Sequence, residues 1–103
     1  MVSNGHLRVT PGQEPDTYVV SGEIDMDSAA QIAEISAPHN GSDIVLDFSE
    51  VTFLDSIGIW ALVNLAAGLE GGGKLVVAHA NGAVKRTLEM ADVPAIAAIV
   101  LRD

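Results

Sequence analysis

The sequence of 103 residues contains no cysteine, and basic and aromatic residues are scarce. The lack of cysteine excludes disulfides, thiolate metal ligands and catalytic thiols. Phenylalanine, tryptophan and tyrosine together make up only 4% of the residues, although 49% are hydrophobic. A folded core must therefore consist mainly of valine, isoleucine, leucine and alanine.

Positive charge is also scarce, because five lysines and arginines stand against fourteen aspartates and glutamates. The formal net charge of −9 leads to repulsion from nucleic-acid phosphates and anionic membrane surfaces. We therefore expect no direct binding to nucleic acid or to membrane. A protein partner is expected to offer a neutral or basic surface.

Long apolar runs are missing as well. No run approaches the roughly 18 residues of a membrane-spanning helix, and residues 1–9 lack the charged and apolar regions of a secretion signal. We expect a cytoplasmic protein. The length fits one domain over residues 1–103.

The apolar pattern that is present predicts alternating strands and helices. Strands are expected at 6–10, 17–21, 43–48, 74–79 and 95–101, although periodicity alone leaves a helical turn open for the last segment. Helices are expected from Ser28, from Ser56 and after Asn81, and Ser28 and Gln31 have the spacing of a capping box. Residues 43–48 are nearly all apolar, as in a strand covered on both faces.

This order of elements predicts an α/β fold. The sheet is expected to be mixed and four- to five-stranded, with an antiparallel N-terminal pair and with parallel strands joined by crossover helices. The carboxyl ends of parallel strands meet at one edge of a sheet, so Asp25, Asp55 and Ser56 are expected to lie close together. The residues alone leave open whether Ser56 merely caps a helix or carries a function.

A serine hydrolase is a remote alternative. Leu54 stands where the first glycine of a G-x-S-x-G elbow belongs, and His6, His39 and His79 are scattered along the chain. These histidines also lack the spacing of a metal site, and we expect no metal or other cofactor.

Two apolar residues, one in the predicted second helix and one in the loop after the second strand, could be either buried or exposed. The helical spacing of Trp60 favours packing in the core over a role as a partner-contact anchor. Met26 lies between two aspartates, where it is either tucked under the helix or exposed for a partner.

Four segments together resemble the STAS domain of bacterial anti-sigma factor antagonists. They are SGEID (21–25), LDFSEVTFLDSIGI (46–59), GGGKLVV (71–77) and AVKRTLEMADV (83–93). They cover nearly the whole chain in the order and spacing of that family. The D-S-x-G-I element beside an upstream G-E-I-D is the most specific part of the resemblance.

The resemblance implies a binding protein without catalytic activity. In the family, an anti-sigma factor with serine kinase activity phosphorylates the serine of the D-S motif, which corresponds to Ser56. The unphosphorylated antagonist binds that anti-sigma factor and releases a sigma factor. The resemblance also implies a PP2C-type phosphatase as a second partner. The expected oligomeric state is a monomer or weak dimer. We expect the partner-binding surface to contain Asp25, Met26, Asp55, Ser56, Ile57 and Gly58.

The resemblance implies separate roles for three of these residues. Asp25 corresponds to a loop aspartate near the phosphorylation site, and Asp55 to the aspartate that precedes the serine. Gly58 corresponds to a glycine that lets the start of the helix pack closely.

Two positions depart from the family pattern. Ile57 replaces a small or hydroxyl residue and makes the predicted surface more apolar. Asp92 replaces the glycine that usually ends the third helix, a place where aspartate can take the left-handed conformation. Other family members act as stressosome subunits, transporter appendages or accessory parts of lipid-transport systems. A phosphorylation-independent scaffold or transporter-associated subunit is therefore the alternative function.

Overall fold

The computed structural model describes residues 7–36, 43–69, 73–96 and 98–102. Its strands are β1 (Leu7–Pro11), β2 (Thr17–Ile24), β3 (Ile44–Leu54), β4 (Leu75–Ala78) and β5 (Ile99–Arg102). Its helices are α1 (Ala29–Ala33), the short 3-10 helix η1 (Glu34–Ser36), α2 (Ser56–Ala67), α3 (Gly82–Ala91) and α4 (Val93–Ile96).

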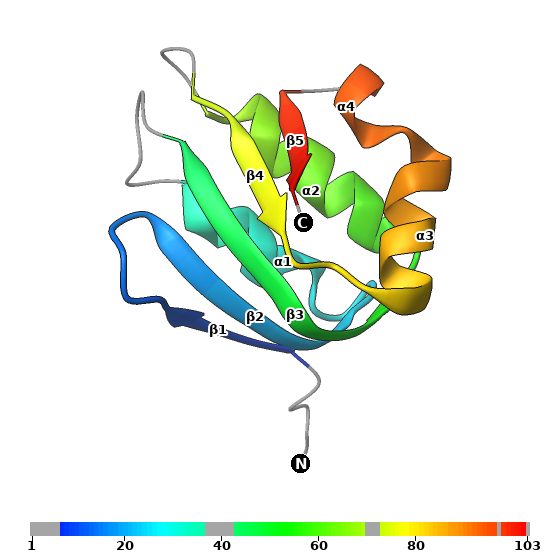
Figure 1. Cartoon of the computed structure of the whole chain (residues 1–103), viewed down its shortest axis with the longest axis horizontal. Helices are drawn as coiled ribbons and strands as arrows, with labels where there is room; N and C mark the ends of the chain where they lie inside the picture. Colours follow the sequence, from blue (N-terminus) through cyan, green and yellow to red (C-terminus); the bar gives the residue numbers. More distant parts are fainter. Residues whose placement is uncertain (1–6, 37–42, 70–72, 97, 103) are drawn as a thin grey trace.

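The five strands form one sheet in the order β1-β2-β3-β4-β5 (Figure 1). β1 and β2 are antiparallel, and the pairs β2/β3, β3/β4 and β4/β5 are parallel. Helices make the connections between the parallel strands, as such connections require. The predicted mixed α/β fold is therefore confirmed.

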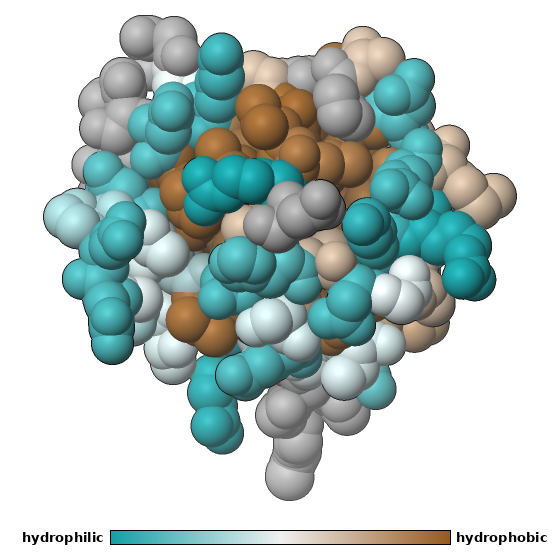
Figure 2. Space-filling view, in the orientation of Figure 1, coloured by the Kyte–Doolittle hydropathy of each residue, from teal (hydrophilic) through white to brown (hydrophobic). Residues whose placement is uncertain are grey.

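The helices pack on one face of the sheet. In Figure 1, α1 and α2 lie behind the strands. Leu46 and Phe48 of β3 point to that side and are fully buried. Val45 lies on the opposite face, in one row with Val76 of β4 and Val100 of β5. Figure 2 shows apolar surface over these three strands. The prediction that residues 43–48 are covered on both faces is wrong, because alternate residues face the side on which the described residues form no helix.

Two segments differ from their predicted bounds. β3 continues for 11 residues, to Leu54, and its last part pairs with β2 alone. The apolar segment 95–101 contains the end of α4 followed by most of β5, so both interpretations of it are partly right. The predicted end of α1 before Pro38 falls at the edge of the described residues, which stop at Ser36.

The two ends of α3 are fixed in different ways. Asp92 ends the helix in the left-handed conformation, with φ 52° and ψ 49°, as the departure from glycine predicts. Asn81 occupies the predicted N-cap position, but its side chain makes no capping hydrogen bond. Its Nδ2 instead donates to the carbonyl oxygen of Ser49 at 3.4 Å, which links the start of α3 to β3.

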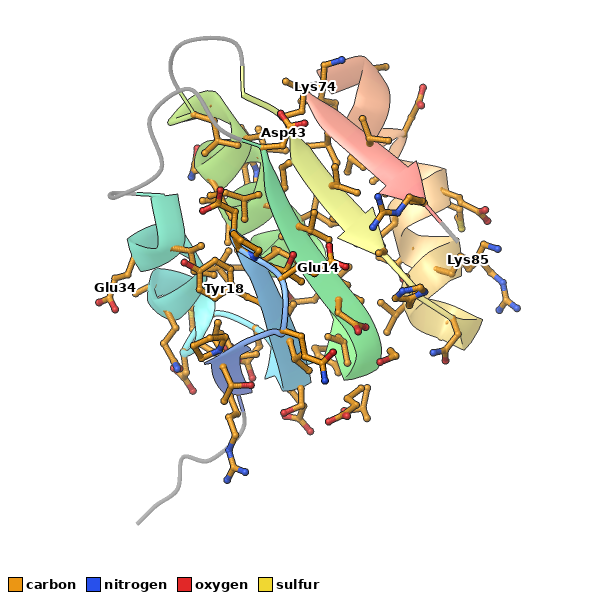
Figure 3. All side chains as sticks on the ribbon, turned by 60° about the vertical axis from the view of Figure 1, so that its left-hand side comes forward. Glu14, Tyr18, Glu34, Asp43, Lys74 and Lys85 are labelled. Carbon is orange, nitrogen blue, oxygen red and sulfur yellow. The ribbon has the colours of Figure 1, made fainter. Side chains whose placement is uncertain are left out.

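The amino ends of β3 and β4 are joined at the edge of the sheet away from Ser56. The backbone N–H of Lys74 donates to Oδ1 of Asp43 at 2.9 Å, and the two residues lie side by side in Figure 3. Each stands directly before its strand. This local hydrogen bond explains the aspartate at that position, and the candidate functional residues lie at the opposite edge.

Candidate functional site

The site lies where β2 and β3 end. Ile24 and Leu54 are partners in the parallel register and are the last residues of their strands. Asp25 and Asp55 follow them directly, so the two loops leave the sheet side by side. The predicted proximity of these loops is confirmed.

Asp55, and not Ser56, caps helix α2. Asp55 is extended, with φ −113° and ψ −173°, and its Oδ1 accepts a hydrogen bond from the N–H of Gly58 at 2.9 Å. Ser56 is the first residue of the helix and is exposed. Within the described residues its hydroxyl has no hydrogen-bond partner. The interpretation of Ser56 as a mere cap is wrong, because the preceding carboxylate already fills that role.

Gly58 allows α2 to approach the end of β2 closely. A Cβ at this position would lie 2.7 Å from the carbonyl oxygen of Ile24 and 2.6 Å from Cδ1 of Leu54. The close packing that the family resemblance implies for Gly58 is therefore present. Gly58 is buried, so it positions the start of α2 and offers no side chain to a partner.

The loop after β2 is built around Asp25 and Ser28. Oδ1 of Asp25 accepts from the backbone N–H groups of Asp27 at 3.0 Å and of Ser28 at 3.2 Å. The Ser28 hydroxyl is buried, lies 2.9 Å from the carbonyl oxygen of Glu23 and accepts from the N–H of Asp25 at 3.0 Å. The predicted capping box is absent, because Ser28 is engaged in this loop and the Gln31 amide reaches β1 instead. Asp25 thus has a structural role within its loop.

Three large apolar side chains of the Asp25 loop and of the first turns of α2 are exposed. The exposed fraction is 72% for Met26, 42% for Ile57 and 62% for Trp60. The open question about Met26 is settled in favour of exposure. The prediction that Trp60 packs in the core is wrong. The buried residues of α2 are Gly58, Ala61, Leu62, Leu65 and Ala66.

The chain around the site carries acidic groups without basic ones. No lysine or arginine occurs between Arg8 and Lys74, a stretch that includes all of β2, β3 and α2. Asp25 and Asp55 flank the site, and Asp27 is exposed beside them. These segments therefore contribute only negative charge, in keeping with the net charge of −9.

Among the described residues, no histidine lies where it could act as a general base for Ser56 in hydrolysis. His79 is the only histidine among the described residues, and it lines a hollow on the open face of the sheet with Asp47 and Arg102. No hydrogen bond joins it to Ser56 in the described part of the chain. His6 and His39 lie outside the described residues. The described ranges also contain no cluster of three or more side chains able to hold a metal ion.

Among the residues that the structure describes, no helix is long and apolar enough to cross a membrane.

The structure places most of the predicted site residues at one helix start. Asp55, Ser56, Ile57 and Gly58 lie at the start of α2, and Asp25 follows β2, the strand that Gly58 of α2 packs against. The burial of the Ser28 hydroxyl in the loop and the exposure of Trp60 do not follow from the sequence pattern.

Comparison with known structures supports the fold. A Thermotoga maritima protein assigned to the anti-sigma factor antagonists is 18% identical, with a TM-score of 0.71 over 96% of this chain and 87% of that chain. The anti-sigma factor antagonist SpoIIAA in its unphosphorylated form is 17% identical, with a TM-score of 0.67 over 92% and 86%. A STAS domain of an anti-sigma factor antagonist from Rhodobacter sphaeroides is 20% identical, with a TM-score of 0.52 over 75% and 90%.

A comparison with curated proteins finds no match. The profile of the family described as "Mlab, STAS domain" matches residues 8–101, which is nearly the entire chain. The chain belongs to the STAS domain family.

Proposed function

We propose that the chain is a cytoplasmic anti-sigma factor antagonist controlled by phosphorylation of Ser56. The unphosphorylated form binds an anti-sigma factor with serine kinase activity and thereby releases a sigma factor. Phosphorylation of Ser56 stops this binding, and a PP2C-type phosphatase restores it. The chain acts as a monomer or weak dimer, without direct contact with nucleic acid or membrane.

The availability of the Ser56 hydroxyl carries this proposal. Asp55 supplies the helix cap, so Ser56 is not needed for that structural task. An exposed hydroxyl at the first residue of a helix is open to a kinase. The kinase transfers the γ-phosphoryl group of ATP to Oγ of Ser56, the hydroxyl gives up its proton, and ADP leaves.

The similar structures support the proposal at the level of the fold. SpoIIAA is an anti-sigma factor antagonist of this fold whose structure is that of an unphosphorylated form. The D-S-x-G-I element of this chain, Asp55 to Ile59, begins the helix that such a modification would mark. Asp25, Met26 and Ile57 are proposed to complete the surface that the partner contacts.

The expected change in charge is large enough to stop binding. A phosphoserine adds about 1.5 to 2 negative charges at neutral pH. In an interface with an effective dielectric constant of about 20, two like charges about 4 Å apart repel by about 4 kcal/mol. A hundredfold loss of affinity requires only about 2.7 kcal/mol. Repulsion from Asp25, Asp55 or an acidic partner group, together with loss of water by the phosphate, therefore suffices.

The test compares four baits in a pull-down from the host of the protein: wild type, Ser56→Ala, Ser56→Glu and the control Ser49→Glu. Ser49 is exposed on β3, so Ser49→Glu adds the same charge away from the site. We expect wild type, Ser56→Ala and Ser49→Glu to capture an ATP-binding anti-sigma kinase, and Ser56→Glu to bind it at least about tenfold more weakly. Equal affinity of Ser56→Ala and Ser56→Glu would refute the proposed control by phosphorylation.

A phosphorylation-independent scaffold or transporter-associated subunit is the second candidate. The exposed side chains of Met26, Ile57 and Trp60 favour it, since apolar contacts of this kind do not require a charge change. In that case all four baits would capture the same partners, and membrane transport components among them would identify the transporter-associated form.

A further inference from the structure

A small apolar hollow lies between α2 and α4 and includes the proposed phosphorylation site. Its volume is about 210 Å³, and its lining consists of Ser56, Ile59, Trp60, Val63 and Ile96. Ser56 is the only polar residue of this set. Trp60 and Ile96 are 62% and 56% exposed, so the rim of the hollow is accessible.

We propose that this hollow receives one aromatic or branched aliphatic side chain of the anti-sigma partner, an inference that rests on the proposed function. A cavity of about 150 Å³ lined by apolar side chains is large enough to bind benzene. The hollow beside Ser56 is larger, at about 210 Å³, and is open to one side. It therefore has room for a single anchor residue, and such residues carry much of the affinity of protein interfaces.

Charge favours a different protein over a second copy of this chain as the occupant. Each copy has a formal net charge of −9, and the stretch between Arg8 and Lys74 has no basic residue to offset Asp25 and Asp55. A symmetric dimer across this surface would place these acidic groups against each other. A partner segment with an apolar anchor and neutral or basic flanks would meet complementary surface instead.

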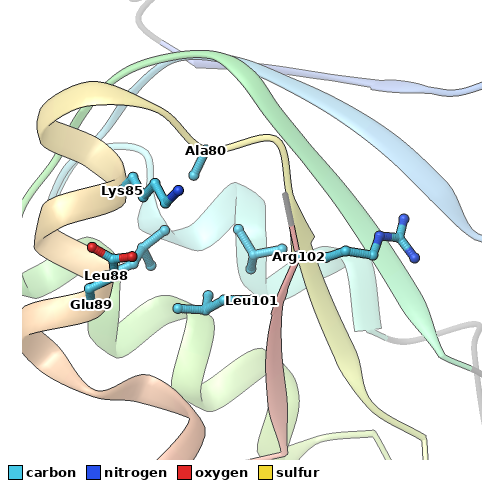
Figure 4. A pocket seen from close by; sticks show the side chains of 7 residues that line it. Ala80, Lys85, Leu88, Glu89, Leu101 and Arg102 are labelled. Carbon is cyan, nitrogen blue, oxygen red and sulfur yellow. The ribbon is translucent and has the colours of Figure 1, made fainter.

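Two other hollows are less suited to this role. The one between α3 and β5 is lined by charges of both signs, from Lys85, Glu89 and Arg102 (Figure 4). The one on the open face of the sheet is lined by charged groups that include Asp47 and Arg102. Ser56 does not line either hollow, so phosphorylation of Ser56 would not add a charge to the lining of either one.

The hollow explains how a negative charge on Ser56 weakens binding even to a basic partner. An anchor that fills the hollow removes water from its rim, where the phosphate would stand. A charged group without water or a paired opposite charge is strongly disfavoured in such surroundings. Phosphorylation therefore acts on the apolar contact, and a basic flank that faces Asp25 or Asp27 does not compensate for it.

The first arm of the test examines the hollow without any protein partner. The neutral probe N-acetyl-phenylalanine amide is titrated into the full chain, with N-acetylglycine amide as the matched control. Binding is followed by NMR shifts and by the emission of Trp60, the single tryptophan. We expect saturable shifts at the lining residues with a dissociation constant in the millimolar range, and no saturation with the glycine compound. Shifts that do not saturate, or that centre on the open sheet face, would overturn the proposal.

The second arm uses the anti-sigma kinase captured by the Ser56→Ala bait, after purification. Trp60→Ala and Ile96→Ser are expected to lower its affinity at least about tenfold. Met90→Ala is the control, because Met90 is 80% exposed on α3 and does not line the hollow. Unchanged affinity of both hollow variants would overturn the proposal.

The two arms separate this inference from the proposed function. If Ser56→Ala and Ser56→Glu capture the same proteins, control by phosphorylation fails, whereas the phenylalanine probe still decides whether the hollow accepts an apolar side chain.

Discussion

Replacing Gly58 with alanine tests how closely α2 must approach β2 for Ser56 to lie beside the Asp25 loop. The added Cβ would lie 2.6 Å from Cδ1 of Leu54 and 2.7 Å from the carbonyl oxygen of Ile24. The leucine methyl group can turn away, but the carbonyl belongs to the backbone of β2. The helix must therefore move or the strand end must shift.

The size of the effect follows from two opposing contributions. Overpacking of a well-packed region lowers the free energy of unfolding by about 1 to 3 kcal/mol. Alanine favours a helix over glycine by up to about 1 kcal/mol, and less in the first turn, where position 58 lies. We expect a net loss of about 1 to 2 kcal/mol, which corresponds to a fall in Tm of roughly 5 to 15 °C for a domain of this size.

Urea and thermal denaturation followed by circular dichroism measure this change. Asn64→Ala is the matched control, because Asn64 is exposed in the same helix and its replacement contributes only the gain in helix propensity. We expect that control to be equal to or slightly more stable than wild type. If Gly58→Ala were as stable as Asn64→Ala, the close approach of α2 to Ile24 would not be a constraint, and the argument for Gly58 would be refuted.

Three further substitutions test the local structure by urea denaturation. Asp55→Ala is expected to lower the free energy of unfolding by about 1 kcal/mol and Asp55→Asn by much less, because asparagine also caps helices; equal losses would contradict the cap. Ser28→Ala is expected to cost about 1 to 2 kcal/mol, since it removes the partner of partly buried backbone groups of Glu23 and Asp25; a neutral result would argue against this loop structure. Asp92→Val is expected to cost at least about 1 kcal/mol, and Asp92→Gly to change stability by less than about 0.5 kcal/mol, because only valine is strained at φ 52°; similar effects of both would contradict the left-handed end of α3.

The neighbourhood of Asp25 and Asp55 could be predicted from the sequence because it follows from topology. Two apolar strands joined through a helix become parallel, and the residues after their carboxyl ends then share an edge. Neither side-chain packing nor exact strand length enters that argument. The prediction therefore held even though β3 is several residues longer than the apolar run at 43–48 indicated.

The exposure of Trp60 could not be predicted in the same way. Helix α2 is apolar around most of its circumference, so the helical period does not single out one buried face. Which face is buried is decided by Gly58, whose lack of a side chain sets the side of the helix that contacts β2. That contact lies between segments far apart in the sequence, and spacing within the helix does not reveal it.

The role of Ser28 was missed for a related reason. A serine before a helix can bond to the helix amides or to the loop that precedes it, and its spacing from Gln31 is compatible with the first choice. In the structure the hydroxyl is buried against Glu23 and Asp25, which fixes the second choice. Only the return of the loop over the end of β2 brings those groups within reach.

The division of roles between Asp55 and Ser56 explains why one added charge can be nearly neutral for folding and decisive for binding. On the free surface, attraction to the helix N-terminus contributes about 0.3 to 1 kcal/mol. Repulsion between charges about 4 Å apart in water is about 1 kcal/mol, so a phosphate near the Asp55 carboxylate roughly cancels that attraction. Once a partner excludes water, the repulsion rises to about 4 kcal/mol at an effective dielectric constant of about 20. The attraction to the helix N-terminus also grows, but only to about 2 kcal/mol in partly buried geometries. Ser56→Glu should therefore unfold at nearly the same temperature as wild type, and its loss of binding would then arise in the interface and not in the fold.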